Sequence, residues 1–345
     1  MKPKLQDIAA QTGLSIATVS RALRSEQDSL VSRDTRNLVR EVAREIGYQP
    51  NLLGRSLKTG RTHTISYWTF DAFSAYYAQI AQQIGEQAAQ RGYSVVIQNA
   101  RDATHSLAAA GTYTENYEGN AVAAHFDGVI AACDVSFARR DFARVQRPPS
   151  TPWVGINVSY DCDLDHAFLD LHDGALQVMR HLLSGGLQRV AMMIRGGATL
   201  SYDPRVRAYR QMMDAGGLPQ QHIEVVAHRR REARASMVAF VEESRALGRE
   251  LPQAIFCVND EVAIGAYRGL CDLDVRVPDE VRLVGCGGIE DTEYHACPIS
   301  TVAMPIDEMC RTAWDYLENR LREPDLPLQQ ITLKPQLVVR ASSQF

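Results

Sequence analysis

The residues of this chain whose types and spacing could do chemistry form a pattern for recognition. In the stretch from Lys4 to Leu23, Ile16, Ala17 and Arg21 fall on one face of an expected short helix. An arginine can donate two hydrogen bonds to guanine O6 and N7, and small apolar side chains can contact a thymine methyl. The sequence carries no glycine-rich phosphate loop, nucleophile elbow or H-E-x-x-H motif, so no enzymatic activity is predicted.

Two short helical patterns around a tight bend would position this face. Leu5 and Ile8 lie on one apolar helix face, and Gly13 matches a helix end that needs a left-handed residue. Ser15 is a good N-cap for a second helix that begins at Ile16. An ordinary helical hairpin is the alternative, but the arrangement is typical of a helix-turn-helix, whose second helix lies in the DNA major groove.

The next segment predicts a third helix and then a conditional one. The third helix opens at Val31-Ser32, and we expect its apolar side to be buried and its arginines exposed; these are Leu38, Val42 and Ile46, and Arg33, Arg36, Arg40 and Arg44. Residues 51–62 have leucines on one side, but an isolated helix this short is unstable in water. A plain flexible linker is the alternative for this segment.

The charge distribution agrees with a DNA-binding N-terminus. The chain has a net charge of -4, yet residues 1–62 hold 11 Lys+Arg and 6 Asp+Glu, a balance of +5. The remainder holds 37 − 11 = 26 basic and 41 − 6 = 35 acidic residues, a balance of -9. Positive potential is therefore concentrated where phosphate attraction requires it.

Several features predict a cytoplasmic protein. No apolar run approaches the length of a membrane span, and the N-terminus lacks the apolar region of a secretory signal. The seven cysteines are odd in number and include no C-x-x-C, which favours reduced thiols. We therefore expect no membrane partner.

From His63 onwards, short apolar strands alternate with amphipathic helices. This alternation predicts parallel sheets covered on both faces. Two successive runs of it imply two α/β lobes, with a cleft between the carboxyl ends of their strands where ligands of such sheets bind.

Three motifs carry a resemblance to a known family: Thr18-Val19-Ser20-Arg21, Gly47-Tyr48-x-Pro50-Asn51 and Arg55-Ser56-Leu57. With them the chain resembles the lactose-repressor/galactose-repressor (LacI/GalR) family of bacterial transcription regulators. The resemblance implies an all-α helix-turn-helix headpiece plus an α/β, two-lobed periplasmic-binding-protein-like effector domain with parallel sheets.

The resemblance also divides the chain. It implies a headpiece at 1–50, a hinge helix and linker at 51–62, and a ligand-binding and dimerisation domain at 63–345. Within that domain the chain is expected to cross three times between the lobes, with lobe 1 at about 63–158 and 298–325 and lobe 2 at about 159–297 and 326–345.

By the same resemblance, two kinds of DNA contact are expected. Ile16, Ala17 and Arg21 match positions that read base edges, and Leu57 matches a leucine that is wedged into the minor groove at the operator centre. Phosphate contacts, which set register without reading sequence, are expected from four further residues, namely Ser15, Thr18, Ser20 and Asn51. The implied partner is a pseudo-palindromic double-stranded operator bound by a homodimer, because the tail VVRASSQF offers no heptads for a tetramerising coil.

Six residues are candidates for ligand binding in the cleft: Tyr76, Tyr77, Asn157, Arg205, Asn259 and Asp260. Arg205 matches an arginine that holds the ligand in many family members, although Arg207 could be the true match. One of the tyrosines could instead belong to the lobe core, and Asp260 could merely cap a helix.

The sequence departs from the family at the expected cleft. Two commonly acidic positions are Asn157 and Gly287, and Arg229-Arg230-Arg231 stands where an aromatic is common. Because a buried guanidinium without a carboxylate is costly, a sugar acid or phosphorylated sugar is expected ahead of a neutral sugar as the small-molecule effector. A protein carboxylate beside Arg205, supplied by Asp71, Asp203 or Asp260, would restore the missing negative charge and weaken that expectation.

No cofactor or metal is expected. The run Asp161 to His166 resembles the start of a calcium loop, but His166 replaces the glycine at its sixth position. The competing function is a cytoplasmic small-molecule-binding protein or enzyme with a helical extension, against which the basic N-terminus counts most.

Overall fold

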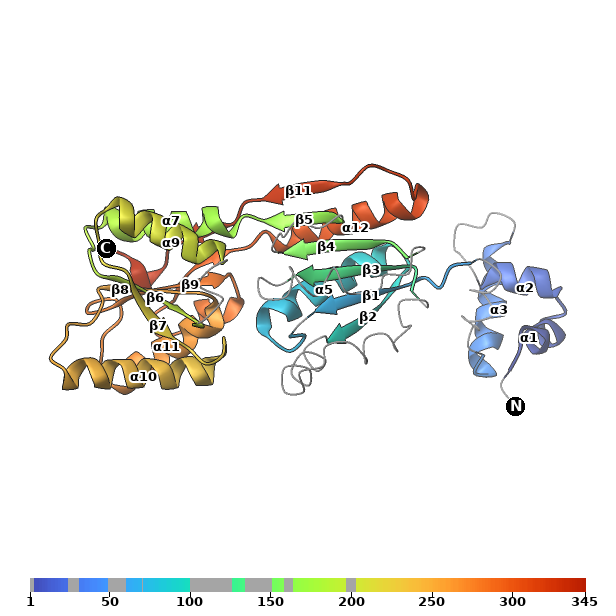
Figure 1. The fold of residues 1–345 in the computed structure, drawn as a ribbon. Helices are drawn as coiled ribbons and strands as arrows, with labels where there is room; N and C mark the ends of the chain where they lie inside the picture. The colour runs from blue at the N-terminus through green and yellow to red at the C-terminus, as the bar shows by residue number, and fades with distance from the viewer. Residues whose placement is uncertain are drawn as a thin grey trace, which may run out of the picture. The chain divides into compact units, whose positions relative to one another are not determined.

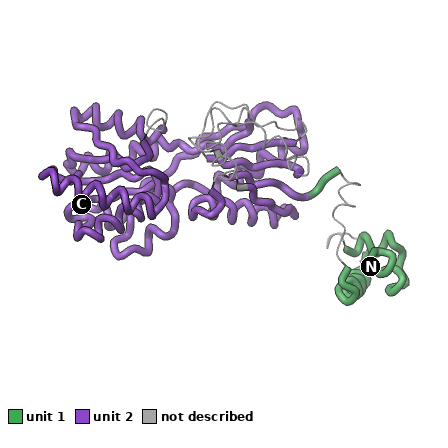
Figure 2. Tube along the Cα trace, turned by 60° about the horizontal axis from the view of Figure 1, so that its bottom comes forward, with its two compact units in different colours: residues 1–62 green, residues 63–345 purple. Residues whose placement is uncertain are grey.

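The computed structural model describes residues 3–23, 31–48, 60–69, 71–99, 126–133, 151–157, 164–196 and 203–345. The chain forms two compact units, residues 1–62 and residues 63–345 (Figure 2). The expected hinge residues Asn51 and Leu57 lie outside the described residues.

Unit 1–62 contains helices α1 (Leu5–Thr12), α2 (Ile16–Ala22) and α3 (Arg33–Glu45). Gly13 ends α1 with a φ of 68°, the left-handed conformation that its position predicted. The helices pack around one small core made of Ile8, Val19, Ala22, Val31, Val39 and Ala43.

The register expected for α3 is partly wrong. Val39 and Ala43 are its buried apolar residues, whereas Leu38 is 45% exposed. Arg36 is buried rather than exposed, and its Nη2 donates to the Val31 carbonyl oxygen at 3.2 Å. The small side chains of Val39 and Ala43 allow the helices to pack closely. The Arg36 guanidinium gives a hydrogen-bond partner to a buried carbonyl group that precedes the helix.

The described part of unit 63–345 has two six-stranded sheets, and Figure 1 labels most of their strands. The first has the order β11-β5-β4-β3-β1-β2, and all its pairs are parallel. The second has the order β12-β10-β9-β8-β6-β7, and only β10 and β12 pair antiparallel. This arrangement confirms the predicted α/β class with parallel-dominated sheets.

The strands of the first sheet are β1 (Thr64–Thr69), β2 (Ser94–Asn99), β3 (Gly128–Cys133), β4 (Trp153–Asn157), β5 (Asp165–Leu169) and β11 (Gln330–Leu333). Those of the second are β6 (Val190–Ile194), β7 (Gln221–Glu224), β8 (Ala254–Cys257), β9 (Arg282–Gly287), β10 (Ser300–Ala303) and β12 (Gln336–Val338). Strands such as β6 are buried throughout, because helices cover both faces of a parallel sheet.

Helices α5 (Ala75–Gln90) and α12 (Ile306–Arg322) pack together against the first sheet. Two pairs, α7 (Leu171–Ser184) with α9 (Pro204–Ala215) and α10 (Arg230–Ala246) with α11 (Asp260–Asp272), pack on the second sheet from opposite faces (Figure 1). Short 3-10 turns η2 (Glu290–Glu293) and η3 (Ala341–Ser343) complete the second lobe.

The chain passes three times between the two sheets: from β5 to α7, from β10 to α12, and from β11 to β12. The lobe boundaries expected from the resemblance are wrong in detail. Residues 165–169 and 330–333 belong to the first sheet, and residues 300–303 belong to the second. A strand joins the sheet in which its backbone finds partners, and apolar periodicity does not reveal those partners.

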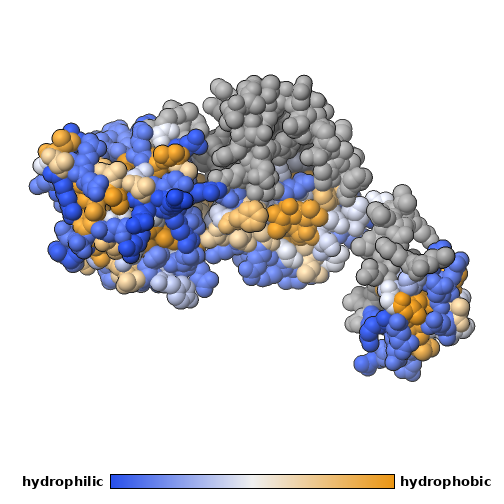
Figure 3. Space-filling model, turned by 90° about the horizontal axis from the view of Figure 1, so that it is seen from below, coloured by the Kyte–Doolittle hydropathy of each residue, from blue (hydrophilic) through white to orange (hydrophobic). Residues whose placement is uncertain are grey.

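The face of the molecule drawn in Figure 3 is largely hydrophilic where it is coloured, with separate apolar patches on both units. Among the described residues of unit 1–62, the exposed large apolar residues are Ile16 and Leu38. Among the described residues, no helix is both long enough and apolar enough to cross a bilayer.

Candidate functional site

Helix α2 presents the predicted base-reading residues on one exposed face. Ser15 is its N-cap, and the Ser15 Oγ accepts a hydrogen bond from the Thr18 backbone N–H at 3.1 Å. The cap fixes where the helix begins, and as a result Ile16, Ala17 and Arg21 are exposed. Ile16 is 46% exposed on a helix of seven residues, so this face carries apolar surface that a partner could cover.

The polar residues expected at DNA phosphates lie on or beside the same helix. The Ser15 and Thr18 hydroxyl oxygens are 2.8 Å apart, and Thr18 and Ser20 are half-buried. Asn51 and Leu57 lie outside the described residues. Of the predicted DNA-binding residues, the structure therefore brings together only those on or beside α2.

In the second lobe, Arg205 is held by the residue that caps its own helix. Asp203 is the N-cap of α9 and accepts the Arg205 backbone N–H at 2.8 Å. Its carboxylate also accepts Arg205 Nε at 3.0 Å and Nη2 at 2.7 Å, and Arg205 Nη1 donates to the Val258 carbonyl oxygen at 2.6 Å. The guanidinium expected to lack a protein carboxylate therefore has one.

The pair is almost fully removed from water. The Asp203 side chain is 0% exposed and that of Arg205 is 13% exposed. Burial acts to raise the pKa of Asp203, but the Arg205 guanidinium outweighs burial and brings that pKa below its usual value. Asp203 is therefore ionised at neutral pH, and the pair carries no net charge.

In the first lobe, Tyr76 and Asn157 meet at the carboxyl ends of β1 and β4. The Tyr76 hydroxyl donates to Asn157 Oδ1 at 3.1 Å, and burial raises the pKa of Tyr76 well above its usual value. Asn157 has a φ of 80°, a left-handed conformation that asparagine tolerates better than most residues. Tyr77 lies edge-on to Tyr76, with ring centroids 5.3 Å apart.

Tyr76 also packs against the apolar cores of both lobes, whereas Tyr77 packs against the core of the first lobe only. The first turn of α5 therefore joins the two lobes. Both tyrosine rings pack against a lobe core, and the Tyr76 hydroxyl is also hydrogen-bonded. Ligand contact by either tyrosine stays a prediction.

Asn259 and Asp260 follow β8, as expected, but have different contacts. Asn259 is the N-cap of α11, and its Oδ1 accepts the Val262 N–H at 2.8 Å. Asp260 is 1% exposed; its carboxylate accepts the Ile289 N–H at 3.0 Å and the Thr301 hydroxyl at 2.6 Å. The alternative that Asp260 caps the helix is therefore wrong, because Asn259 does so.

The Asp260 carboxylate also explains the glycines of β9. A Cβ on Gly285 would lie 2.2 Å from Asp260 Oδ1, and a Cβ on Gly287 would lie 3.0 Å from Oδ2. Burial raises the pKa of Asp260 to about 6, against the lowering effect of its hydrogen bonds. The commonly acidic position at Gly287 is thus compensated by a carboxylate that reaches the same place from α11.

The arginine tract at the start of α10 is largely paired. Arg230 contacts Glu261 at 2.7 Å and Asp291 at 3.0 Å. Arg229 is 3.9 Å from Asp71, which follows β1 in the first lobe. Arg231 is exposed.

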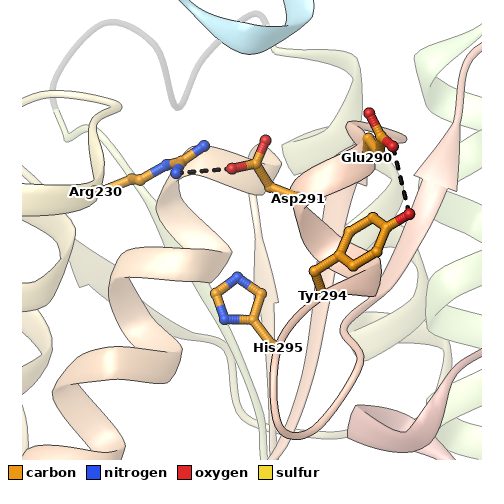
Figure 4. Close-up of a pocket in the computed structure, with 5 residues that line it drawn as sticks. All are labelled: Arg230, Glu290, Asp291, Tyr294 and His295. Carbon is orange, nitrogen blue, oxygen red and sulfur yellow. Dashed lines mark hydrogen bonds and ion pairs between the residues drawn. The ribbon is translucent and has the colours of Figure 1, made fainter.

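A pocket of about 370 Å³ lies beside this tract, lined by Arg230, Glu290, Asp291, Tyr294 and His295 (Figure 4). Arg230 and Asp291 point toward one another across it, and His295 points up from the segment after η2. Burial lowers the pKa of His295 and the Arg230 guanidinium lowers it further, so this imidazole is neutral at physiological pH. None of the six predicted ligand residues lines this pocket.

Sequence reasoning did not select Phe73, whose side chain is 89% exposed between β1 and α5. An aromatic residue soon after a strand of a parallel sheet was the signal that could have found it. The role of Asp203 could also have been found, since Asp-Pro-Arg is a strong start signal for a helix.

Comparison with known proteins gives matches to both units. Residues 4–51 match the family described as bacterial regulatory proteins, lacI family, and residues 179–343 match the periplasmic binding protein-like domain.

Whole-length relatives are also found. The chain is 28% identical to the HTH-type transcriptional regulator DegA of Bacillus subtilis (strain 168) over 360 residues, covering 99% of this chain and 98% of DegA. It is 27% identical to the ribose operon repressor of Escherichia coli (strain K12) over 348 residues, covering 98% and 99%. Among solved structures, the lac repressor dimer bound to operator and the anti-inducer ONPF has a TM-score of 0.76 at 22% identity, covering 99% of each chain.

Proposed function

Because the chain belongs to the lacI family of bacterial regulatory proteins and is a DNA-binding transcriptional regulator with an effector-binding domain, we propose that it represses genes of carbohydrate catabolism. The observation that carries this proposal is the exposed face of α2, which combines Ile16, Ala17 and Arg21 on a basic unit separate from the α/β unit. Such a face suits base edges in a major groove.

Each DNA-facing residue has a distinct proposed role. Arg21 donates to a guanine, and Ile16 and Ala17 contact thymine methyls. The hydroxyls and one amide hold phosphates; these are Ser15, Thr18, Ser20 and Asn51. Leu57 is inserted into the minor groove at the operator centre, where an apolar wedge pays unstacking energy and gains contact with bent DNA.

We propose a homodimer, since a pseudo-palindrome needs two headpieces. In the second lobe, η3 folds onto β9 and β10. Ser342 is 0% exposed there and donates to the Leu283 carbonyl oxygen at 2.5 Å. Light scattering at micromolar concentration should give the dimer mass, and a stable monomer or tetramer would contradict the proposal.

For the effector, we propose a small carbohydrate bound by the residues that follow the strands, namely Tyr76, Tyr77, Asn157, Arg205, Asn259 and Asp260. The sequence favoured a sugar acid or phosphorylated sugar on the premise that Arg205 lacks a protein carboxylate. The bidentate bond to Asp203 removes that premise. A guanidinium already neutralised can still donate to hydroxyls, so a neutral sugar now stands ahead of the acid.

We propose that the effector acts through the relation between the lobes. Tyr76 packs on both cores, and Asp71 and Arg229 come from different lobes, so a ligand that moves one lobe changes both contacts. A differential affinity for two lobe arrangements is then a coupling free energy between effector and operator. By linkage, operator binding changes effector affinity by the same factor.

Thermal-shift screening of the full chain tests the effector class with matched pairs, for example a hexose beside its uronic acid and its phosphate. We expect stabilisation by a neutral sugar that Arg205→Ala abolishes. Stabilisation by the acid or the phosphate alone would contradict a neutral sugar and favour a sugar acid or phosphorylated sugar as the effector. A separate mobility-shift assay with genomic DNA at several salt concentrations distinguishes a DNA-binding regulator from a solute-binding protein or enzyme. Phosphate contacts make the affinity for DNA fall steeply as the salt concentration rises.

A further inference from the structure

The chain crosses between the two lobes at one edge of each sheet, which we call the connected edge. The strands beside these crossings are β5, β10, β11 and β12, and each stands first or second in the order of its sheet. The Asp170 N–H donates to the Leu333 carbonyl oxygen at 2.9 Å, which joins the β5-to-α7 crossing to the β11-to-β12 crossing. The Gln177 Nε2 also donates to the Pro335 carbonyl oxygen at 2.9 Å. The connected edge therefore fixes the lobes to one another on one side.

An ion pair joins the lobes near the opposite edges of the sheets. Asp71 follows β1, which stands fifth in the first sheet, and Arg229 follows β7, which stands last in the second. The Arg229 Nη2 lies 3.9 Å from the Asp71 Oδ2, and the two side chains are 51% and 28% exposed. Figure 1 shows β5 and β11 above β1 and β2 in the first lobe, and α10, whose N-cap is Arg229, at the bottom of the second. The chain and the ion pair thus connect the lobes on different sides.

Backbone hydrogen bonds hold both members of the pair in place. The Asp71 carbonyl oxygen accepts the Ser74 N–H at 3.0 Å and the Ser74 hydroxyl at 3.2 Å, just before α5 begins. The Arg229 N–H donates to the Ala227 carbonyl oxygen at 2.9 Å, and its own carbonyl oxygen accepts the Ala233 N–H at 2.9 Å. Each charged side chain therefore starts from a fixed point beside a helix. The distance between the two charges follows the positions of the lobes.

Apolar side chains also bridge the lobes. Ala75 and Tyr76, in the first turn of α5, pack against the core of the second lobe, and Met304, in the β10-to-α12 crossing, packs against both cores. Apolar contact is non-directional, so it persists when two surfaces turn slightly against one another. An ion pair instead depends on the distance between two charges. Because a rotation about the connected edge displaces the opposite edges most, the ion pair is the contact that such a rotation disturbs most.

We propose that Asp71 and Arg229 form an electrostatic latch, which holds the lobes in this arrangement and is released when they turn about the connected edge. An ion pair of this exposure shifts an equilibrium by about two- to fivefold. An effector typically changes affinity at a distant site by roughly 5–150-fold, so its binding suffices to open the latch. The latch therefore sets how easily the effector changes the lobe arrangement.

The consequence for DNA binding rests on the proposed function. In the described chain β1 is the first strand after unit 1–62, and Asp71 follows its carboxyl end. Release of the latch frees this end of a strand whose other end continues into the linker of the DNA-binding unit. Asp71 and Arg229 then regulate operator affinity without contacting DNA.

The experiment measures hydrogen–deuterium exchange of the full chain in Asp71→Arg, in Arg229→Asp and in the double variant. Each single change places like charges at the latch. Amides of residues 78–84 and 233–239, in α5 and α10, should then exchange about two- to fivefold faster than in the wild type. The double variant restores opposite charges and should regain most of the protection. Arg231→Asp is the matched control, because it makes the same charge change at an exposed neighbour, and it should exchange like the wild type.

Salt supplies a second readout. Because salt screens exposed charges, exchange at these amides should become faster in the wild type and slower in the single variants as ionic strength rises. The inference is overturned if the double variant exchanges as fast as the single ones, if Arg231→Asp matches Arg229→Asp, or if salt leaves the wild type unchanged.

Operator binding is measured separately, with a genomic fragment that the wild type selects. Each single variant should differ from the wild type by about two- to fivefold in affinity, and the double variant should bind like the wild type. Arg231→Asp again controls for the change in net charge. Equal affinity in all variants contradicts the regulatory role of the latch. If the wild type selects no DNA, the proposed function fails, and the exchange measurement alone still decides whether the latch holds the lobes.

Discussion

Asp203→Asn is the substitution that most directly tests the neutralised pair at the predicted effector site. The asparagine keeps an oxygen that can accept the Arg205 backbone N–H, so the helix cap is retained. It removes the negative charge and leaves the guanidinium in a place where its side chain is only 13% exposed.

The expected cost is about 3 kcal/mol in the free energy of unfolding, the lower end of what breaking a buried pair costs. The lower end applies because Arg205 keeps some access to water and the Val258 carbonyl oxygen. Replacing both residues by apolar or neutral side chains of similar size should cost much less, so Asp203→Asn with Arg205→Met should recover about 2 kcal/mol.

Urea unfolding of the full chain should be followed by far-UV circular dichroism. Tryptophan emission would not report unfolding of the second lobe, since Trp68, Trp153 and Trp314 all belong to the first lobe. The reasoning fails if Asp203→Asn is as stable as wild type, or if the double variant loses as much as the single one.

The pH dependence of the same pair has a defined sign. The folded-state pKa of Asp203 lies below its ordinary value, so its contribution is present above the unfolded pKa of about 3.9. It is lost as pH falls through the lower folded-state pKa. The difference between wild type and Asp203→Asn should therefore be constant from neutral pH to about pH 5 and shrink below about pH 4.

The remaining expectations concern DNA binding and two buried titratable groups. Arg21→Ala should weaken operator binding by about 1–3 kcal/mol per half-site and relax the preference at one base pair, as titration of operator variants would report. Leu57→Ala should weaken specific binding and spare nonspecific binding; equal affinity for a selected operator would rule out the wedge. Because burial lowers the pKa of His166 to about 3, wild type should lose stability below about pH 6.5, a slope that His166→Gln should lack in urea titrations. Because burial raises the pKa of Asp260 to about 6, its contribution is lost as pH rises from about 4 to 6, a loss that Asp260→Asn should not show.

Features set by local sequence were predictable. Ser15 as N-cap, Gly13 in a left-handed conformation and the exposed side of α2 follow from neighbours within one helical turn. The parallel sheets follow from strands that are apolar along their whole length, such as β6.

Features set by distant partners were not predictable. The Asp260 carboxylate accepts hydrogen bonds from Ile289 and Thr301, which are distant in the sequence. Position 285 is a glycine because a Cβ there would clash with that carboxylate. Strand β11 is assigned to the first sheet by its register with β5, which apolar pattern alone leaves open. Arg36 is buried because a carbonyl five residues earlier needs a donor, although an arginine on a helix is usually solvated.

Three arginines near the carboxyl ends of the strands have carboxylate partners within the protein. Arg205 is neutralised by Asp203, Arg230 contacts two carboxylates, and Arg229 lies 3.9 Å from Asp71. With these groups compensated within the protein, a ligand gains little by bringing its own charge and more by matching hydrogen-bond positions. A site built to bond a hydroxyl rejects an analogue that lacks it far more strongly than a hydrophobic pocket rejects an extra methylene. On the proposed function, epimers and deoxy analogues of the effector should therefore differ in affinity more than a neutral sugar differs from its charged derivative, and a series of calorimetric titrations that ranked them the other way would show that an uncompensated charge remains.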